Sequence, residues 1–351
     1  MIVEHGGDVW RGGSPGEWLD FSANLNPEGP PAWVRAALAE GVRRVGVYPD
    51  PRDAAALAGL SAHLSLPEDC LLPTAGGIEA ASLVALLARE TCAGHAVAQP
   101  TFQEYGRLCG AHRDISRAAL ADYRPRPGEW LWLCNPNNPT GDALPRAELL
   151  SLLGRVAAAG GWLVLDEAFI DYCPEYSLRD LAPECPSLVV LGSLTKSLAI
   201  PGARLGYVAA HPGAINALRR LGPPWRLNCL AAAVAAALPG HAADFERIRA
   251  LNASRREAFA AGLAALGARV YPSEANFLLC DFGRDMRPAA EALRERGILV
   301  RPCGAFPGLT HGHVRLCVRT EADNERLINT EIRLLCFPGK GVQATCAANR
   351  S

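Results

Sequence analysis

The sequence contains almost no lysine. Of its 351 residues 35 are lysine or arginine, and the only lysines are Lys196 and Lys340. Arginine stays protonated in proteins, whereas a lysine amine can lose its proton and attack a carbonyl group. A lysine after a strand is more often a solvated loop charge. Lys196, however, lies inside an apolar segment and is followed by Arg204, so we interpret it as a candidate nucleophile.

An excess of charge of one sign is also lacking, since the formal net charge is -1 and no basic block occurs. Nucleic acid and anionic membrane surfaces are therefore not expected partners. The longest apolar run, residues 229–238, is too short to span a bilayer, and the first residues lack the pattern of a signal peptide. These absences predict a cytoplasmic protein.

Closely spaced cysteine pairs are absent as well. The 12 cysteines are scattered singly and never form a Cys-x-x-Cys motif. This spacing favours buried free thiols in a reducing compartment over disulfides, and no metal site is expected.

The length exceeds the usual size of a single core, about 250–300 residues, so more than one domain is expected. We predict an N-terminal arm that forms part of a small domain, a large domain, the rest of the small domain and a frayed tail. Their respective bounds are residues 1–45, 46–250, 251–335 and 336–351.

Short apolar strands alternate with helices between residues 70 and 207. Strands are predicted at 71–72, 96–98, 129–134, 161–166 and 187–192, and the last four lack polar alternation, as in a sheet covered by helices on both faces. This order predicts an α/β fold with a mostly parallel sheet and functional loops at the carboxyl ends of its strands. One long helical region, 228–266, and a small α+β unit are expected to follow.

Several chemically suggestive residues follow these strands. Gly76 and Gly77 open a helix, where free amides can bind an anion, although glycine turns at helix starts are common. The constrained turn 135–141 would aim an asparagine amide inward. Asp166 ends an apolar strand, where burial of a carboxylate is costly unless a positively charged partner meets it. A helix N-cap or an ion pair with an arginine would also account for an aspartate at this position.

Ser193, Lys196 and Arg204 add a hydroxyl, an amine and a guanidinium to this set. Together the residues suit the phosphate, pyridine nitrogen, phenolic oxygen and aldehyde of pyridoxal 5'-phosphate (PLP). The motifs Gly76-Gly77, Asn138–Gly141, Asp166–Phe169 and Ser193–Tyr207 resemble, in order, those of the fold-type I, aspartate aminotransferase-like PLP enzymes. This resemblance implies a large domain with a mostly parallel sheet and a small α+β domain.

The resemblance also implies a role for each matching residue. Lys196 would form the Schiff base and move protons, Asp166 would pair with the pyridine nitrogen, and Asn138 would donate to the phenolic oxygen. Tyr105 would stack on the ring. Tyr48 would reach the phosphate of a neighbouring subunit, which implies a homodimer. The residues implied for the cofactor phosphate are Gly76, Gly77, Ser193 and Arg204.

Within this family the sequence resembles two groups, the histidinol-phosphate aminotransferases and the threonine-phosphate decarboxylases of cobalamin biosynthesis. The start His5-Gly6-Gly7, the segment 20–27 and Phe169, where aminotransferases of this group usually have tyrosine, favour the decarboxylases. The expected substrate is then L-threonine O-3-phosphate, a small phosphorylated amino acid. The residues expected to bind it are His5, Gly6, Asn24, Asn138, Arg301 and Arg315.

The sequence leaves three further points open. An aminotransferase acting on histidinol phosphate is the alternative function. A PLP-binding regulatory domain without turnover is a more remote alternative, because such regulators usually carry a DNA-binding module at the N-terminus. Arg319 shares a strand face with Arg315 and could be either a substrate ligand or part of a surface salt bridge.

Overall fold

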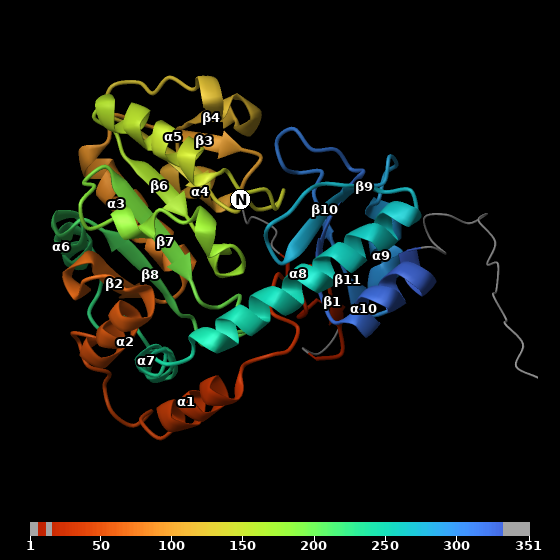
Figure 1. Ribbon diagram of the computed structural model, residues 1–351, viewed down its shortest axis with the longest axis horizontal. Coiled ribbons are helices and arrows are strands. Elements are labelled where there is room, and N and C mark those ends of the chain that lie inside the picture. Colours follow the sequence, from red (N-terminus) through yellow and green to blue (C-terminus); the bar gives the residue numbers. More distant parts are fainter. Residues whose placement is uncertain (1–5, 12–15, 333–351) are drawn as a thin grey trace, which may run out of the picture.

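The computed structural model describes residues 6–11 and 16–332 of the chain (Figure 1). His5 and the predicted tail, residues 336–351, lie outside the described residues. The first half contains β1 (Leu19–Asp20), α1 (Ala32–Val42), α2 (Ala54–Leu64), β2 (Leu71–Thr74), α3 (Gly77–Thr91), β3 (Gly94–Gln99), α4 (Glu104–Cys109), β4 (Arg113–Ser116), β5 (Glu129–Cys134), α5 (Arg146–Ala158) and β6 (Leu163–Asp166). The second half contains β7 (Leu188–Ser193), β8 (Gly206–Ala210), α6 (Pro212–Leu221), α7 (Cys229–Ala236), α8 (Ala242–Ala265), β9 (Arg269–Val270), β10 (Phe277–Asp281), α9 (Arg287–Glu295), β11 (Ile298–Leu299), β12 (Arg301–Pro302), β13 (His313–Cys317) and α10 (Glu321–Arg326).

A seven-stranded sheet forms the centre of the larger body, in the order β2-β8-β7-β6-β5-β3-β4. The strands from β7 to β4 pair in parallel, whereas β8 runs antiparallel to both of its neighbours, β7 and β2. The predicted mostly parallel sheet is confirmed. The five predicted strands correspond to β2, β3, β5, β6 and β7, but β4 and β8 were not predicted as separate strands.

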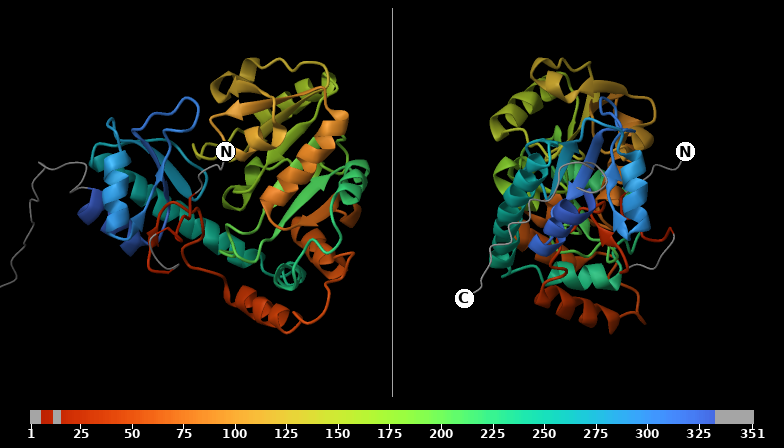
Figure 2. Two further views of the ribbon diagram at one scale, coloured as in Figure 1. Left: turned by 180° about the vertical axis from the view of Figure 1, so that it is seen from behind. Right: turned by 90° about the vertical axis from the view of Figure 1, so that its right-hand side faces the viewer.

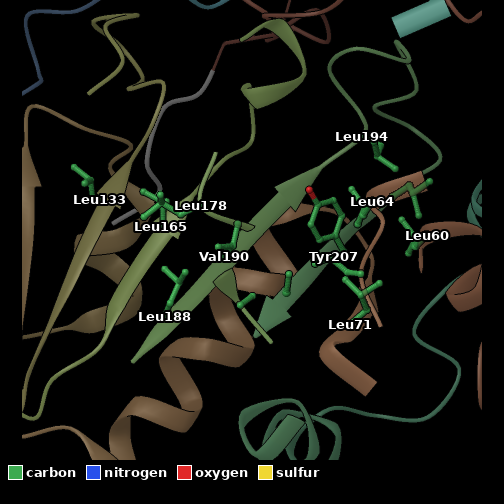
Figure 3. Close-up of a cluster of buried hydrophobic side chains, with 14 of the residues drawn as sticks. Leu60, Leu64, Leu71, Leu133, Leu165, Leu178, Leu188, Val190, Leu194 and Tyr207 are labelled. Atoms are coloured by element: carbon green, nitrogen blue, oxygen red, sulfur yellow. The ribbon is translucent and has the colours of Figure 1, made fainter. Parts of the chain in front are cut away.

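Both faces of this sheet are buried, which explains the unbroken apolar strands. In β5, Leu131 and Leu133 point to one core cluster, whereas Trp130 and Trp132 point to the other. Successive side chains of a strand face opposite sides, so helices on both faces require apolar residues at every position. Figure 1 shows helices on the two sides of the sheet, and Figure 3 shows leucines of the first cluster around Tyr207.

The predicted helical region 228–266 consists of two helices, α7 and α8, with a short break between them. Pro239 and Gly240 lie between the two helices, and Gly240 has a φ of 88°. Proline lacks the backbone N–H that a helix interior needs, and the positive φ at Gly240 turns the chain out of the helix.

A smaller four-stranded antiparallel sheet has the order β12-β13-β10-β9, and the arm strand β1 pairs in parallel with β11. Helix α8 connects the two bodies, since Phe245 belongs to the core of the large sheet and Phe259 to that of the small sheet. Figure 2 shows α8 running from one body to the other. The domain limits given above remain predictions, and the limit at residue 250 falls within α8.

Among residues 6–11 and 16–332, no helix is both long enough and apolar enough to cross a membrane. The same part of the chain contains no group of three histidine, cysteine or acidic residues arranged to hold a metal ion.

Candidate active site

Lys196 follows the buried strand β7 at the carboxyl edge of the large sheet. Burial lowers the pKa of its amine from 10.5 to about 8, and the positive charges of Arg315 and Arg204 act in the same direction. The Lys196 carbonyl accepts a hydrogen bond from the backbone N–H of Asn26, at 3.0 Å. The lysine is therefore anchored through its backbone and carries an amine that is partly neutral near physiological pH.

Asp166 ends the neighbouring strand β6 and is buried. Its carboxylate accepts hydrogen bonds from the hydroxyl of Tyr105 and, at 2.9 Å, from the backbone N–H of Ala168. Burial raises the pKa of Asp166, while these hydrogen bonds and the charge of Lys196 act against the rise. A second cationic donor would stabilise the charged carboxylate further, as a protonated pyridine nitrogen would do.

Tyr105, on α4, is buried with its hydroxyl toward Asp166, and its ring lies 5.7 Å from that of Trp132. The sequence did not predict this hydrogen bond. Stacking of Tyr105 on a cofactor ring stays a prediction.

Four predicted phosphate ligands meet between β2, β7 and the start of α3. A β-carbon built on Gly76 would lie 2.6 Å from Nη2 of Arg204, and one built on Gly77 would lie 3.6 Å from Cβ of Ser193. Gly76 also has a φ of 85°, which favours glycine. No side chain caps the first turn of α3, so its backbone N–H groups and the helix dipole can bind an anion there.

Arg315, on β13, is the most enclosed cation of the site, with 6% of its surface exposed. Its guanidinium donates to Oδ1 of Asn138 at 2.5 Å and to the Ser22 carbonyl at 2.6 Å, whereas its buried Nε has no partner among the described residues. Burial lowers its pKa to about 10. Arg301 lies directly opposite on β12 and is also buried. Two adjacent buried guanidinium groups favour an anionic ligand.

The arm contributes two more predicted residues to this region. A β-carbon on Gly6 would lie 2.0 Å from the Ser22 carbonyl oxygen and 3.2 Å from Nη2 of Arg315, so only glycine fits. Asn24 is buried, and its Oδ1 has no hydrogen-bond partner in the described part of the chain. Gly6 and Arg301 also line a cavity of about 680 Å³.

Tyr48 is not brought to the other predicted site residues. It is 84% exposed, and its ring lies 5.1 Å from that of Trp225. Its predicted contact lies in a partner subunit and stays a prediction. Arg319 donates to the carboxylate of Asp323 and to the Asp20 carbonyl. Of the two alternatives that the sequence left open for Arg319, these contacts correspond to the salt bridge.

Two site-forming residues, Asn26 and Ser22, were not identified from the sequence. Asn26 donates from its side chain to the Ser197 carbonyl at 3.0 Å, in addition to its bond to Lys196. Ser22 accepts from Arg315. Both lie in the polar turn 20–27. The two asparagines that precede a proline in this turn were the sequence feature that could have indicated site residues here.

Comparison with known proteins identifies the family. The model of the family "Aminotransferase class I and II" matches residues 16–330. This chain belongs to that family. Its members depend on PLP, and PLP is the cofactor of this chain.

Two curated relatives in this family carry different activities. The threonine-phosphate decarboxylase of Salmonella typhimurium is 35% identical over 349 residues, covering 92% of this chain and 94% of that protein. The histidinol-phosphate aminotransferase of Symbiobacterium thermophilum is 32% identical over 334 residues, covering 92% and 91%.

A solved structure also resembles this chain over most of its length. The L-threonine-O-3-phosphate decarboxylase from Porphyromonas gingivalis has a TM-score of 0.79 and 26% identity, covering 88% of this chain and 96% of that protein. The fold-type I PLP fold predicted from the sequence motifs is therefore confirmed.

The residues present fit PLP. The anion cradle at Gly76, the buried carboxylate of Asp166 and the amine of Lys196 lie at one edge of the sheet and match the phosphate, ring nitrogen and aldehyde of the cofactor. The detailed assignment of each residue to a cofactor atom remains a prediction.

Proposed function

We propose that this chain decarboxylates L-threonine O-3-phosphate to (R)-1-amino-2-propanol O-2-phosphate for cobalamin biosynthesis. The observation that carries this proposal is the buried pair Arg301 and Arg315, on adjacent strands beside the arm. Threonine phosphate brings two anionic groups, a carboxylate and a phosphate, and arginine forks bind both with paired hydrogen bonds. The 35% identity to the Salmonella typhimurium decarboxylase supports the same choice.

The chain's own residues suit the chemistry of this reaction. When bound, PLP accepts the electron pair that the α-carbon gains as carbon dioxide leaves. Asp166 would place a negative charge beside the ring nitrogen of bound PLP, and the hydrogen bond from Tyr105 orients its carboxylate. Lys196, with a pKa of about 8, can hold or release a proton near neutral pH, so it would be able to return a proton to the α-carbon.

Arg315 and Arg301 would hold the anionic groups of the substrate. They would thereby determine which bond of the α-carbon is perpendicular to the plane of the PLP ring. Arg315 already donates to Asn138 and Ser22, which fixes its guanidinium before the substrate arrives. Such preorganisation reduces the ordering cost of binding. Asn24, whose Oδ1 has no hydrogen-bond partner among the described residues, would accept a hydrogen bond from the substrate.

Transamination of histidinol phosphate is the second candidate, favoured by the 32% identity to the Symbiobacterium thermophilum aminotransferase. Phe169 argues against it. The ring of Phe169 lies 6.0 Å from the Lys196 amine and carries no hydroxyl, so it cannot donate a hydrogen bond to the cofactor.

The expected unit is a homodimer. Tyr48 and the nearby valines Val42, Val45 and Val47 are exposed, and Tyr48 contacts the half-exposed Trp225. Burial of such an apolar surface by a second copy would bring Tyr48 to the partner's cofactor phosphate.

A substrate panel tests the proposal. The PLP-loaded protein is incubated with L-threonine O-3-phosphate alone, or with histidinol phosphate and 2-oxoglutarate. Aminopropanol phosphate in the first mixture, with no glutamate in the second, supports the decarboxylase. Glutamate in the second mixture and no product in the first would establish the aminotransferase instead.

A further inference from the structure

The described part of the arm, residues 6–11, packs tightly against the segment that holds Arg315. The Gly7 N–H donates to Oγ of Ser22 at 2.7 Å, and Gly6 has no space for a β-carbon beside the Ser22 carbonyl. Ser22 is itself fixed, since its hydroxyl donates to Asp20 at 2.6 Å and its carbonyl accepts from Arg315. One serine therefore holds both the arm and the guanidinium that we assign to the substrate.

The other end of the arm is held by Arg294, on α9. Its guanidinium donates to the Arg11 carbonyl at 2.8 Å and contacts the Asp8 carboxylate at 3.3 Å and the Asp8 carbonyl at 3.5 Å. The same guanidinium lies 5.4 Å from the ring centre of Trp18, which holds it in place. Ion pairs that also make hydrogen bonds in a fixed geometry are the ones that stabilise a structure measurably.

These contacts border a single cavity. Its wall includes Gly6, Ser22, Arg294 and Arg301, and its volume is about 680 Å³. Release of the arm at Arg294 would leave only the Gly7 hydrogen bond, among the contacts described above, to keep Gly6 beside Arg315. The position of the arm therefore affects the shape of this cavity, which Arg301 lines, and the space beside Arg315.

We propose that Arg294 is a positioning residue that clamps the arm through Asp8 and Arg11, so that Gly6 completes the substrate pocket beside Arg315. This proposal rests on the proposed function, because it assigns the cavity lined by Gly6 and Arg301, and the region where Gly6 lies beside Arg315, to the phosphorylated amino acid. Arg294 acts through the arm and needs no contact with the substrate.

Trypsin cleavage tests the clamp without any substrate. Arg11 is the only lysine or arginine before Arg35, so cleavage after it releases a defined peptide of residues 1–11. The variant Arg294→Ala should release this peptide about tenfold faster than the wild type, since a hydrogen-bonded charge is lost. Asp8→Ala, which leaves Arg294 on Trp18, should release it about two- to fivefold faster. Equal rates for all three proteins would overturn the clamp.

Steady-state kinetics with PLP-loaded protein test the positioning role. Arg294→Ala should raise the KM for threonine phosphate about tenfold and leave kcat and the absorbance of bound PLP unchanged. Arg247→Ala, which removes an exposed ion pair with Asp244 on α8, is the matched control and should change nothing. Faster tryptic cleavage with an unchanged KM would overturn the positioning role. If the wild type itself releases no carbon dioxide, the proposed function is wrong. The cleavage rates then still test, without any substrate, whether Arg294 holds the arm.

Discussion

The rate at which cofactor-free protein takes up PLP should depend on pH through the Lys196 amine. Burial and the charges of Arg315 and Arg204 lower the pKa of this amine from 10.5 to about 8. Only the neutral amine attacks the cofactor aldehyde. The rate should therefore rise as the pH increases toward 8 and level off above about pH 9.

The size of the effect follows from the two pKa values. At pH 7.5 a pKa of about 8 leaves about one amine in four neutral, whereas an ordinary lysine is neutral about once in a thousand. The environment of Lys196 should thus accelerate PLP uptake at pH 7.5 about 200-fold over the same reaction at an exposed lysine. Replacement of Arg315 by methionine removes a positive charge, so the pKa of Lys196 should rise and the rate curve should move to higher pH.

Stopped-flow absorbance of bound PLP, recorded from pH 6 to pH 10.5, measures the curve for the wild type and for Arg315→Met. Arg247→Met removes an exposed charge on α8 and serves as the control, whose midpoint should equal that of the wild type. A wild-type rate that still climbs steeply at pH 10 would refute the lowered pKa. A midpoint for Arg315→Met that is unchanged or lower would refute the electrostatic explanation.

Three further substitutions test other parts of the site. Gly76→Ala places a β-carbon 2.6 Å from Arg204 at a φ of 85°, so the free energy of unfolding should fall by about 1–3 kcal/mol and PLP should bind more weakly. Urea unfolding and a PLP titration measure these two effects. Wild-type values for both would contradict the role of Gly76 in the phosphate cradle. Asp166→Asn removes the charge beside the ring nitrogen and should lower kcat about 10²- to 10³-fold with PLP still bound; an unchanged kcat would rule out the role of Asp166. Arg315→Lys keeps the positive charge but loses the guanidinium group that contacts Asn138, so the KM for threonine phosphate should rise about 10- to 100-fold. A wild-type KM would contradict the assignment of Arg315 to the substrate site.

The sequence predicted that Asp166, Ser193 and Gly76 would lie near one another, because they follow strands that run in the same direction within one sheet. Asp166 ends β6, Ser193 ends β7 and Gly76 follows β2, and the carboxyl ends of parallel strands meet at one edge. Motif order and a single rule of sheet topology were therefore enough to bring them together. The break between α7 and α8 at Pro239 could also have been predicted, because proline cannot continue a helix. The long alanine-rich pattern instead suggested one continuous helical region.

The substrate end could not be derived in the same way. Arg315 and Asn138 are 177 residues apart in sequence, and their hydrogen bond depends on how the small sheet packs against the large one. The bonds from Arg315 to Ser22 and from Asn26 to Lys196 likewise depend on where the arm lies. Resemblance pointed to Arg315, but only tertiary packing reveals its partners.

Release of labelled carbon dioxide in the absence of any 2-oxo acid tests the central proposal most directly. PLP-loaded protein is mixed with a large excess of L-threonine O-3-phosphate that carries ¹³C in its carboxyl group. The decarboxylase should release many equivalents of ¹³CO₂ per active site, together with an equal amount of aminopropanol phosphate. A transaminase without an acceptor stops after one substrate per site and retains the label, and that result would contradict the proposed function.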